Sequence, residues 1–272
     1  MTQRPQVDYD HLAPTYNQRF AGPPLQGTVH ALQTLAADVE RTETRIMEIG
    51  CGTGRWLAEL ADPARQCYGL DPSAGMLRQA QQRTAPIHSV GRNGIPTITW
   101  VQGRGEHIPL PDDNFDLLYA VNVIHHITGQ RAFIDEAYRV LRPGGRLAII
   151  GMDPHGRRDT WYVYHYFEGT YETDLVRFPR WSTVVEWMAA AGFQSIRREP
   201  VEHIVDPKYG RSVLDDPFLK KHATSQLALL SDEAYAAGLR RIEATLAEAD
   251  DDLCFPVEII SEMIVGTATG HE

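Results

Sequence analysis

Three glycines and two carboxylates stand where two short apolar runs end. Gly50, Gly52 and Gly54 occupy alternate positions, Glu48 precedes them, and Asp71 follows the next apolar run. Glycines have no Cβ, so the backbone can turn tightly and come close to a ligand. In parallel sheets, ligands bind where a strand ends beside a helix N-terminus, and an acid at the next strand end binds ribose hydroxyls. The spacing therefore predicts a site for a ligand that contains a ribose.

The glycine spacing departs from the dinucleotide-binding pattern G-x-G-x-x-G. Arg55 stands where that pattern has its last glycine, and Glu48 places a carboxylate two residues before the first glycine. A carboxylate repels a pyrophosphate but suits a ligand with an ammonium group. Nicotinamide-dependent oxidoreductases are therefore an alternative that this turn disfavours.

Two further groups of residues are candidates for chemistry. His125 and His126 follow an apolar run, and a histidine can act as a general base because it titrates near neutrality. Their alternative role is packing or bonding to backbone. Trp161, Tyr164 and His165 would share a helical face with Glu168 and line an apolar pocket for a substrate. The alternative for this aromatic segment is an interdomain or homodimer contact.

The composition narrows the class of partner. The chain has 272 residues and a net charge of −10, with 26 Lys+Arg against 36 Asp+Glu. Nucleic-acid binding usually needs a basic surface, so an acidic chain argues against DNA or RNA. No apolar run approaches the roughly 20 residues of a membrane span, and the polar N-terminal residues resemble no secretory signal. We expect a cytoplasmic protein with three free cysteines and no metal site, since no cluster of metal-ligating residues occurs.

Strands and helices alternate along the first half of the chain. Apolar runs at 45–49, 67–71, 98–101, 115–120 and 147–150 predict strands, with helices between most of them. This alternation indicates βαβ units and a mostly parallel sheet. Helices within 8–42 precede it, and the second half predicts a helix at 182–191, a strand at 193–202, a helical insertion near 206–250 and a last strand at 255–267. We expect one domain over 1–272, with an N-terminal helical cover (1–44), a cofactor-binding core (45–152) and a substrate-side segment (153–272).

Four segments together resemble the class I S-adenosylmethionine-dependent methyltransferases, especially the small-molecule branch with the ubiquinone and menaquinone biosynthesis enzymes. They are Glu48–Gly54, Gly69–Leu77, Gly103–Asp116 and Leu141–Gly145. The resemblance implies a Rossmann-like, seven-stranded, mostly parallel α/β sheet with helices on both faces and an antiparallel last strand. It also implies S-adenosylmethionine as cofactor and methyl transfer to an O, N or C atom of a small-molecule acceptor. A non-catalytic partner subunit that binds S-adenosylmethionine is the second alternative.

The resemblance also implies roles for individual residues. Gly50, Gly52 and Gly54 would hold the methionine part of the cofactor, Glu48 would orient it, and Asp71 would bind the ribose. The remaining expected contacts are Met76 near the adenine, the Ala120 carbonyl at the cofactor amino group, and Tyr16 closing over the site. The family often has an aspartate where this chain has Arg104, which cannot accept a hydrogen bond from adenine. Either Glu106 or a backbone carbonyl would then take over that contact, or adenine is recognised more loosely, and Gly105 and Glu106 are the candidate residues.

Overall fold

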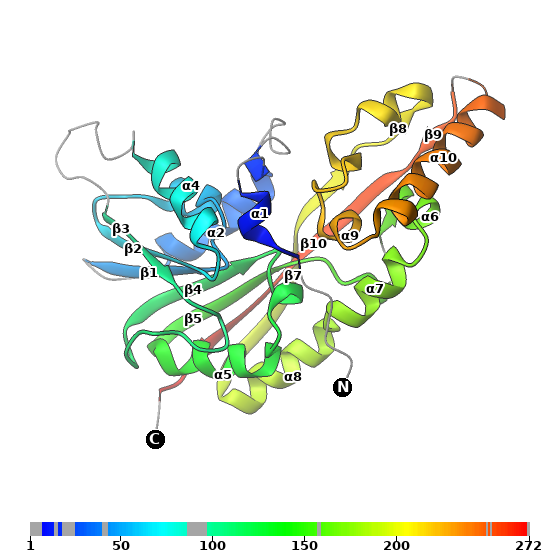
Figure 1. Cartoon of the computed structure of the whole chain (residues 1–272). Coiled ribbons are helices and arrows are strands. Elements are labelled where there is room, and N and C mark those ends of the chain that lie inside the picture. The colour runs from blue at the N-terminus through cyan, green and yellow to red at the C-terminus, as the bar shows by residue number, and fades with distance from the viewer. Residues whose placement is uncertain are drawn as a thin grey trace.

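A computed structural model describes residues 7–13, 16–17, 25–39, 43–85, 97–156, 159–248, 250 and 252–270. Its centre is a twisted sheet in the order β3-β2-β1-β4-β5-β10-β6, with β7 pairing with the other side of β10 (Figure 1). The first five strands are parallel, whereas β10 runs antiparallel to β5 and β7. The strands are β1 (Thr44–Ile49), β2 (Arg65–Asp71), β3 (Thr97–Gln102), β4 (Phe115–Val121), β5 (Leu141–Gly151), β6 (Thr160–Trp161), β7 (Phe193–Val205), β8 (Lys208–Tyr209), β9 (Cys254–Phe255) and β10 (Val257–Ala268).

The α-helices follow the βαβ rhythm that the sequence predicts and add a second group near the C-terminal half. They are α1 (Tyr9–Leu12), α2 (Gln26–Ala37), α3 (Arg55–Leu60), α4 (Ala74–Thr84), α5 (Gln130–Val140), α6 (Tyr162–Tyr166), α7 (Thr170–Arg177), α8 (Trp181–Ala191), α9 (Ser225–Ala228) and α10 (Asp232–Glu248). A short 3₁₀ turn, η3 (Ile124–His126), follows β4. Ser73 caps α4, because its side chain accepts a hydrogen bond from the Met76 N–H.

The two faces of the sheet bury separate hydrophobic clusters, as alternating side chains require. Met47 and Leu118 belong to the cluster under α5 and α8, whereas Ile46 and Leu117, their sequence neighbours, belong to the cluster under α2 and α3. Figure 1 shows α2 and α4 on one side of the sheet and α5 and α8 on the other. The predicted Rossmann-like sheet with helices on both faces is therefore confirmed.

A third hydrophobic cluster lies at the far end of β10. It joins Trp161 and Phe167 to Leu227 and Ile242 of the predicted insertion. Figure 1 shows this lobe, with α6, α9, α10, β8 and β9, at one end of the long strands β7 and β10. The helical insertion near 206–250 is confirmed, and we name this part of the structure the lobe.

Two sequence expectations need correction. Within the described residues the main sheet has eight strands instead of seven, because Thr160 and Trp161 form the short strand β6 against Val257 and Glu258. The strand predicted at 147–150 starts earlier, because β5 begins at Leu141, directly after α5 ends at Val140. Gly144 has a φ of +83°, which glycine tolerates.

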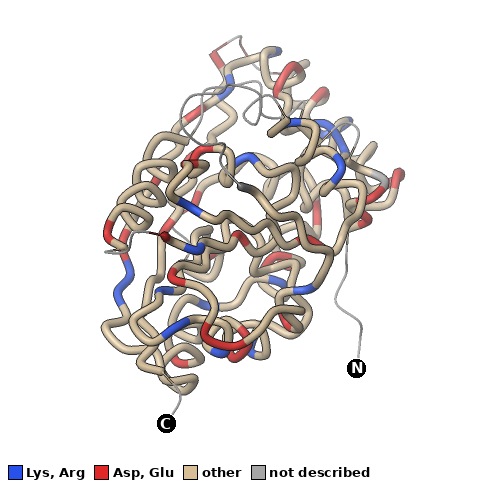
Figure 2. Tube along the Cα trace, turned by 90° about the vertical axis from the view of Figure 1, so that its left-hand side faces the viewer, with Lys and Arg blue, Asp and Glu red and all other residues tan. Residues whose placement is uncertain are grey.

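The distribution of charged residues and the hydropathy of the helices do not change this description of the fold. In the view of Figure 2, basic and acidic residues are interspersed along the trace. Within the described ranges, none of the helices combines the length and apolar character that crossing a membrane requires.

Candidate functional site

Two turns meet where the strand order of the sheet reverses. They are the glycine turn (Gly50–Gly54), which follows β1, and the turn that follows β4 and contains η3. From β1 the chain proceeds outward through β2 and β3, then returns to place β4 on the other side of β1. In open α/β sheets, the crevice at such a switch point, beyond the carboxyl ends of the strands, is where ligands bind. Gly50 lies just beyond β1, and a Cβ on it would meet the Val123 side chain after β4 at 2.1 Å. The absence of a side chain at Gly50 therefore allows the two turns to approach each other.

The glycine turn leaves room for a ligand. Gly50, Gly52 and Gly54 have φ values of +65°, +52° and +71°, which disfavour residues with a Cβ. A Cβ on Gly52 would have no heavy atom within 4 Å, whereas one on Gly54 would meet Trp100 at 2.7 Å. Gly54 is thus needed for packing, and Gly52 borders open space.

Asp71 is tied to the glycine turn from the end of β2. Its two carboxylate oxygens each accept one backbone N–H, from Gly52 and from Ser73, both at 2.9 Å. Burial raises the pKa of Asp71, and these two hydrogen bonds act in the opposite direction. Each oxygen retains lone pairs for further donors, as binding of a ribose would need.

The Glu48 side chain is buried beneath the glycine turn and is not exposed at the surface where a ligand would bind. Its side chain is 1% exposed and accepts a hydrogen bond from the Tyr119 hydroxyl at 3.2 Å. The backbone N–H of Leu57 in α3 is a further donor, and burial raises the pKa of Glu48 well above its ordinary value. Glu48 therefore joins β1, β4 and α3, and any effect of Glu48 on a ligand passes through the turn that it supports.

The remaining residues predicted to contact the cofactor are buried or half-buried. Met76 is 1% exposed, and Glu106 is half-buried opposite Arg104 at 4.0 Å. A Cβ on Gly105 would lie 3.1 Å from Ile49, so that glycine lies beside the end of β1. The pairing of β1 with β4 stops at Tyr119, one residue before Ala120.

The N-terminal segment contacts all parts of this edge. The carboxylate of Asp10 in α1 accepts hydrogen bonds from Ser73 Oγ at 2.7 Å and from the Gly75 N–H at 2.8 Å, at the start of α4. The Thr53 hydroxyl bonds Asn17 at 2.7 Å. The ring of Tyr16 meets that of Tyr9 edge to face at 6.0 Å. An N-terminal cover over the glycine turn is thus present, and no sequence pattern pointed to Asp10 or Asn17.

The two histidines have different surroundings. His126 Nε2 lies 2.8 Å from the Tyr9 hydroxyl. The ring of His125 stacks on Phe178, with centroids 4.0 Å apart and planes at 11°. Burial, followed by the charges of His126 and Arg177, lowers the pKa of His125 well below its ordinary value. His125 is therefore held neutral, and burial opposes its taking up a proton.

The aromatic segment differs from its predicted helical face. The helix covers only Tyr162–Tyr166, so Trp161 belongs to β6 and Glu168 lies outside the helix. Trp161 and Tyr164 do meet, with ring centroids 5.4 Å apart, but His165 is exposed to solvent. The shared face of four residues was therefore wrong, because the helix is too short to align them.

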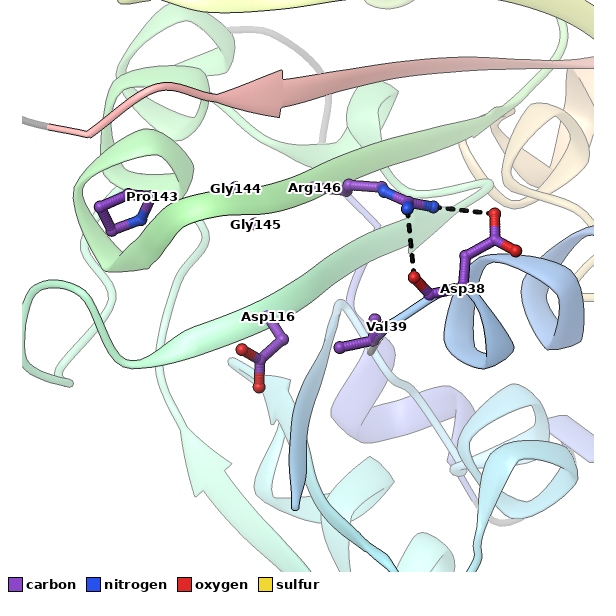
Figure 3. A pocket seen from close by; sticks show the side chains of 7 residues that line it. All are labelled: Asp38, Val39, Asp116, Pro143, Gly144, Gly145 and Arg146. Carbon is purple, nitrogen blue, oxygen red and sulfur yellow. Dashed lines mark hydrogen bonds and ion pairs between the residues drawn. The ribbon is translucent and has the colours of Figure 1, made fainter. Parts of the chain in front are cut away.

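A hollow of about 180 Å³ lies elsewhere, at the amino-terminal ends of β4 and β5. Figure 3 shows Asp116, Arg146 and Asp38 around it, with Arg146 bonded to Asp38. It is at the opposite edge of the sheet from the glycine turn. In the ranges that the structure describes, no group of three or more His, Cys, Asp or Glu side chains is placed to hold a metal ion.

Comparisons with known proteins agree with this geometry. A family model described as "Methyltransferase domain" matches residues 47–149. The demethylmenaquinone methyltransferase of Anoxybacillus flavithermus is 26% identical over 178 residues, covering 58% of this chain and 73% of that protein. An uncharacterised methyltransferase of Mycobacteroides abscessus is 30% identical over 175 residues, covering 61% of each. The phosphoethanolamine N-methyltransferase 2 of Haemonchus contortus, solved with S-adenosylhomocysteine, has a TM-score of 0.57 at 18% identity over 96% of this chain and 58% of that one, a likeness of fold alone.

Fold and family together define an S-adenosylmethionine-dependent methyltransferase with a Rossmann-like core. The family model matches residues 47–149, the part of the chain that holds the glycine turn and Asp71. The expected cofactor and enzyme class are confirmed, and the oxidoreductase and non-catalytic alternatives are not favoured. The matched region ends before the lobe begins.

Proposed function

We propose that this chain transfers a methyl group to a small molecule bound between the glycine turn, η3 and the lobe. The observation that carries the proposal is Asp71, whose carboxylate is fixed by the N–H groups of Gly52 and Ser73 beside the open space at Gly52. An acid at this place suits the ribose hydroxyls of a nucleoside cofactor. When bound, S-adenosylmethionine supplies the electrophilic methyl group.

The residues around the turn suit each part of that cofactor. We infer that Gly50, Gly52 and Gly54 hold its methionine part and that the Ala120 carbonyl meets the amino group. Asp71 would accept the ribose hydroxyls, with Met76, Gly105 and Glu106 on the adenine side. Glu48 acts from below the turn, since its hydrogen-bond partners are Tyr119 and Leu57. The N-terminal cover, with Tyr16, would exclude water from the bound cofactor through the links of Asp10 and Asn17.

Methyl transfer is an in-line displacement, so alignment of the reacting atoms accounts for most of the rate enhancement. A base is needed only for an acceptor that loses a proton. Of the two histidines, we propose His126 for that role, because the Tyr9 hydroxyl fixes its Nε2 and His125 is stacked and held neutral. His125 would form part of the acceptor pocket instead.

We propose the lobe and residues 161–167 as the acceptor side, and 1–272 as one methyltransferase domain that includes them. Trp161 and Tyr164 contribute to this side from the lobe, whereas the exposed His165 would contribute only at its rim. The relatives that match at 25–28% identity include enzymes named for demethylmenaquinone and for a phytyl hydroquinone, and these names favour a ring that bears oxygen atoms. A cytoplasmic location and a homodimer stay predictions.

Calorimetric titration tests the cofactor site. S-adenosylhomocysteine should bind the wild-type chain, and NAD should give no heat. A ligand at about 100 times its dissociation constant should also stabilise the fold by roughly 2.7 kcal/mol, if it binds only the folded state. A clear signal for NAD with none for the sulfur ligand would refute the proposal.

A further inference from the structure

A buried arginine beside the lobe has hydrogen-bond donors that the described residues around it do not use. Arg177, the last residue of α7, is 1% exposed. Its Nη2 donates to Asp174 Oδ1 at 2.5 Å and to Ser225 Oγ at 3.0 Å. Its Nε and Nη1 atoms are buried and have no hydrogen-bond partner among the described residues. Arginine is rarely so buried without partners, because water no longer solvates its N–H groups.

This arginine lies at the junction between the lobe and the turn after β4. The side chain of Gln130 in α5 donates to the carbonyl of Ile124, where η3 begins, at 3.0 Å and to the carbonyl of Arg177 at 2.9 Å. The end of α7 is therefore fixed beside η3. The next residue, Phe178, stacks its ring on His125 and lies 5.8 Å from the Arg177 guanidinium carbon.

His125 adds a second buried atom without a partner at the same junction. Its Nδ1 has no hydrogen-bond partner in the described part of the chain. Arg177 and His125 thus border one aromatic ring, and each has unused hydrogen-bonding capacity. Both lie beside η3, where the proposed function places the acceptor.

The charges around Arg177 favour a neutral ligand. Asp174 is 0% exposed and also accepts hydrogen bonds from the Tyr164 hydroxyl at 2.8 Å and from Gln226 at 2.7 Å. The carboxylate of Asp174 therefore already offsets the positive charge of Arg177. A buried carboxylate or phosphate from a ligand would add an uncompensated charge, whereas a carbonyl or hydroxyl oxygen accepts N–H bonds without one. Because Nε and Nη1 point from different parts of the fork, they suit two separate oxygen atoms.

We propose that Arg177, together with His125, binds neutral carbonyl or hydroxyl oxygens of the methyl acceptor. This inference rests on the proposed function and specifies the chemistry of its acceptor. The site selects a compound with oxygen atoms on an apolar frame over an acid of the same size.

The test uses the full chain saturated with S-adenosylhomocysteine and four probes of one size: 2-naphthol, 1-tetralone, 2-naphthoate and naphthalene. Their affinities are measured by titration, and the Arg177 Nε–H signal is followed by ¹⁵N NMR. Arg177→Lys keeps a cation for Asp174 but removes the Nε and Nη1 donors, and Arg180→Lys, at an exposed position, is the matched control. If Arg177→Lys does not fold, the wild-type signal is assigned from its contacts with the Phe178 ring protons, and the test proceeds on the wild type.

The two neutral oxygen probes should bind more tightly than 2-naphthoate and naphthalene and should shift the Arg177 Nε–H signal. Arg177→Lys should lower the affinity for 2-naphthol about tenfold or more, and Arg180→Lys should leave that affinity unchanged. Preference for 2-naphthoate, an unmoved Nε–H signal, or no binding of the neutral probes by a chain that binds S-adenosylhomocysteine would overturn the inference and leave the cofactor assignment standing. Failure of S-adenosylhomocysteine to bind would instead overturn the proposed function.

Discussion

The Tyr9 hydroxyl lies 2.8 Å from Nε2 of His126, so the N-terminal cover is bonded directly to the turn after β4. The two rings meet edge to face, with centroids 5.1 Å apart. The residue that we propose as the base is therefore oriented by a helix distant from it in sequence. Tyr9 can orient His126 only when α1 is packed against this turn.

Tyr9→Phe tests that link, because it removes the hydroxyl and keeps the ring. One neutral hydrogen bond contributes about 0.5–1.5 kcal/mol, so kcat/KM should fall about two- to tenfold. Affinity for S-adenosylhomocysteine should stay within about threefold. Steady-state kinetics and calorimetry check both values, and an unchanged kcat/KM would show that Tyr9 does not orient a catalytic group.

Asp71→Ala should weaken binding of S-adenosylhomocysteine by about tenfold or more. The variant removes a charged acceptor, and hydrogen bonds to such a group contribute about 1.5–3 kcal/mol each. It also frees the N–H groups of Gly52 and Ser73, so the turn itself loses support. Asp135→Ala, at an exposed acid on α5, is the control. Equal affinity in both variants would mean that Asp71 binds no ribose.

Glu48→Gln should change how stability depends on pH. Burial raises the pKa of Glu48 well above 4.5, so the unfolded chain loses this proton before the folded chain does. The contribution of Glu48 to stability therefore falls as the pH rises above about 4.5. Urea unfolding at several pH values should show that the free energy of unfolding of the glutamine variant rises relative to that of the wild type toward alkaline pH. A constant difference between the two would contradict the raised pKa.

His125→Gln should show the opposite trend. Burial lowers the pKa of His125 well below 6.5, so the unfolded chain takes up a proton in the acidic range before the folded chain does. The contribution of neutral His125 to stability is fully present above about pH 6.5 and is lost as the pH falls below that value. The variant lacks this loss, and it should gain on the wild type between neutral pH and about pH 5. Thermal unfolding across that range checks this prediction. The stability difference between variant and wild type should grow toward acidic pH for His125→Gln and toward alkaline pH for Glu48→Gln.

Tyr164→Phe removes one donor from the buried carboxylate of Asp174. We expect a loss of about 1.5–3 kcal/mol in the free energy of unfolding, impaired turnover, and cofactor affinity within about threefold. Turnover, S-adenosylhomocysteine affinity and mass in solution are measured together. Parallel loss of turnover and cofactor affinity would make the segment a cofactor lid, and a change of mass with full activity would make it a dimer contact.

The sequence predicted the core well because the core depends on local patterns. Buried parallel strands are short apolar runs, and a positive φ at Gly50, Gly52 and Gly54 leaves a visible glycine spacing. Asp71 was found because it stands at a strand end, a position that the strand pattern itself defines.

The lobe and the cover were harder to predict because tertiary contacts determine them. Arginine is mostly an exposed residue type, and Arg177 is buried where α7 packs against α6 and α9. The short helix α6 ends before Glu168, so periodicity assigned His165 to a face that does not exist. Asp10 gains its role from the start of α4, which lies more than 60 positions later in the chain.

The position of β10 has a consequence for synthesis on the ribosome. This strand lies between β5 and β7 but follows both of them, and the whole lobe, along the chain. Until residues 257–268 emerge, β5 ends the parallel half of the sheet with an open edge, and β7 has no neighbour. Unpaired strand edges promote association with other chains, and pairing between distant segments is slow. The nascent chain therefore exposes the unpaired edge of β5 while residues 152–256 are being synthesised.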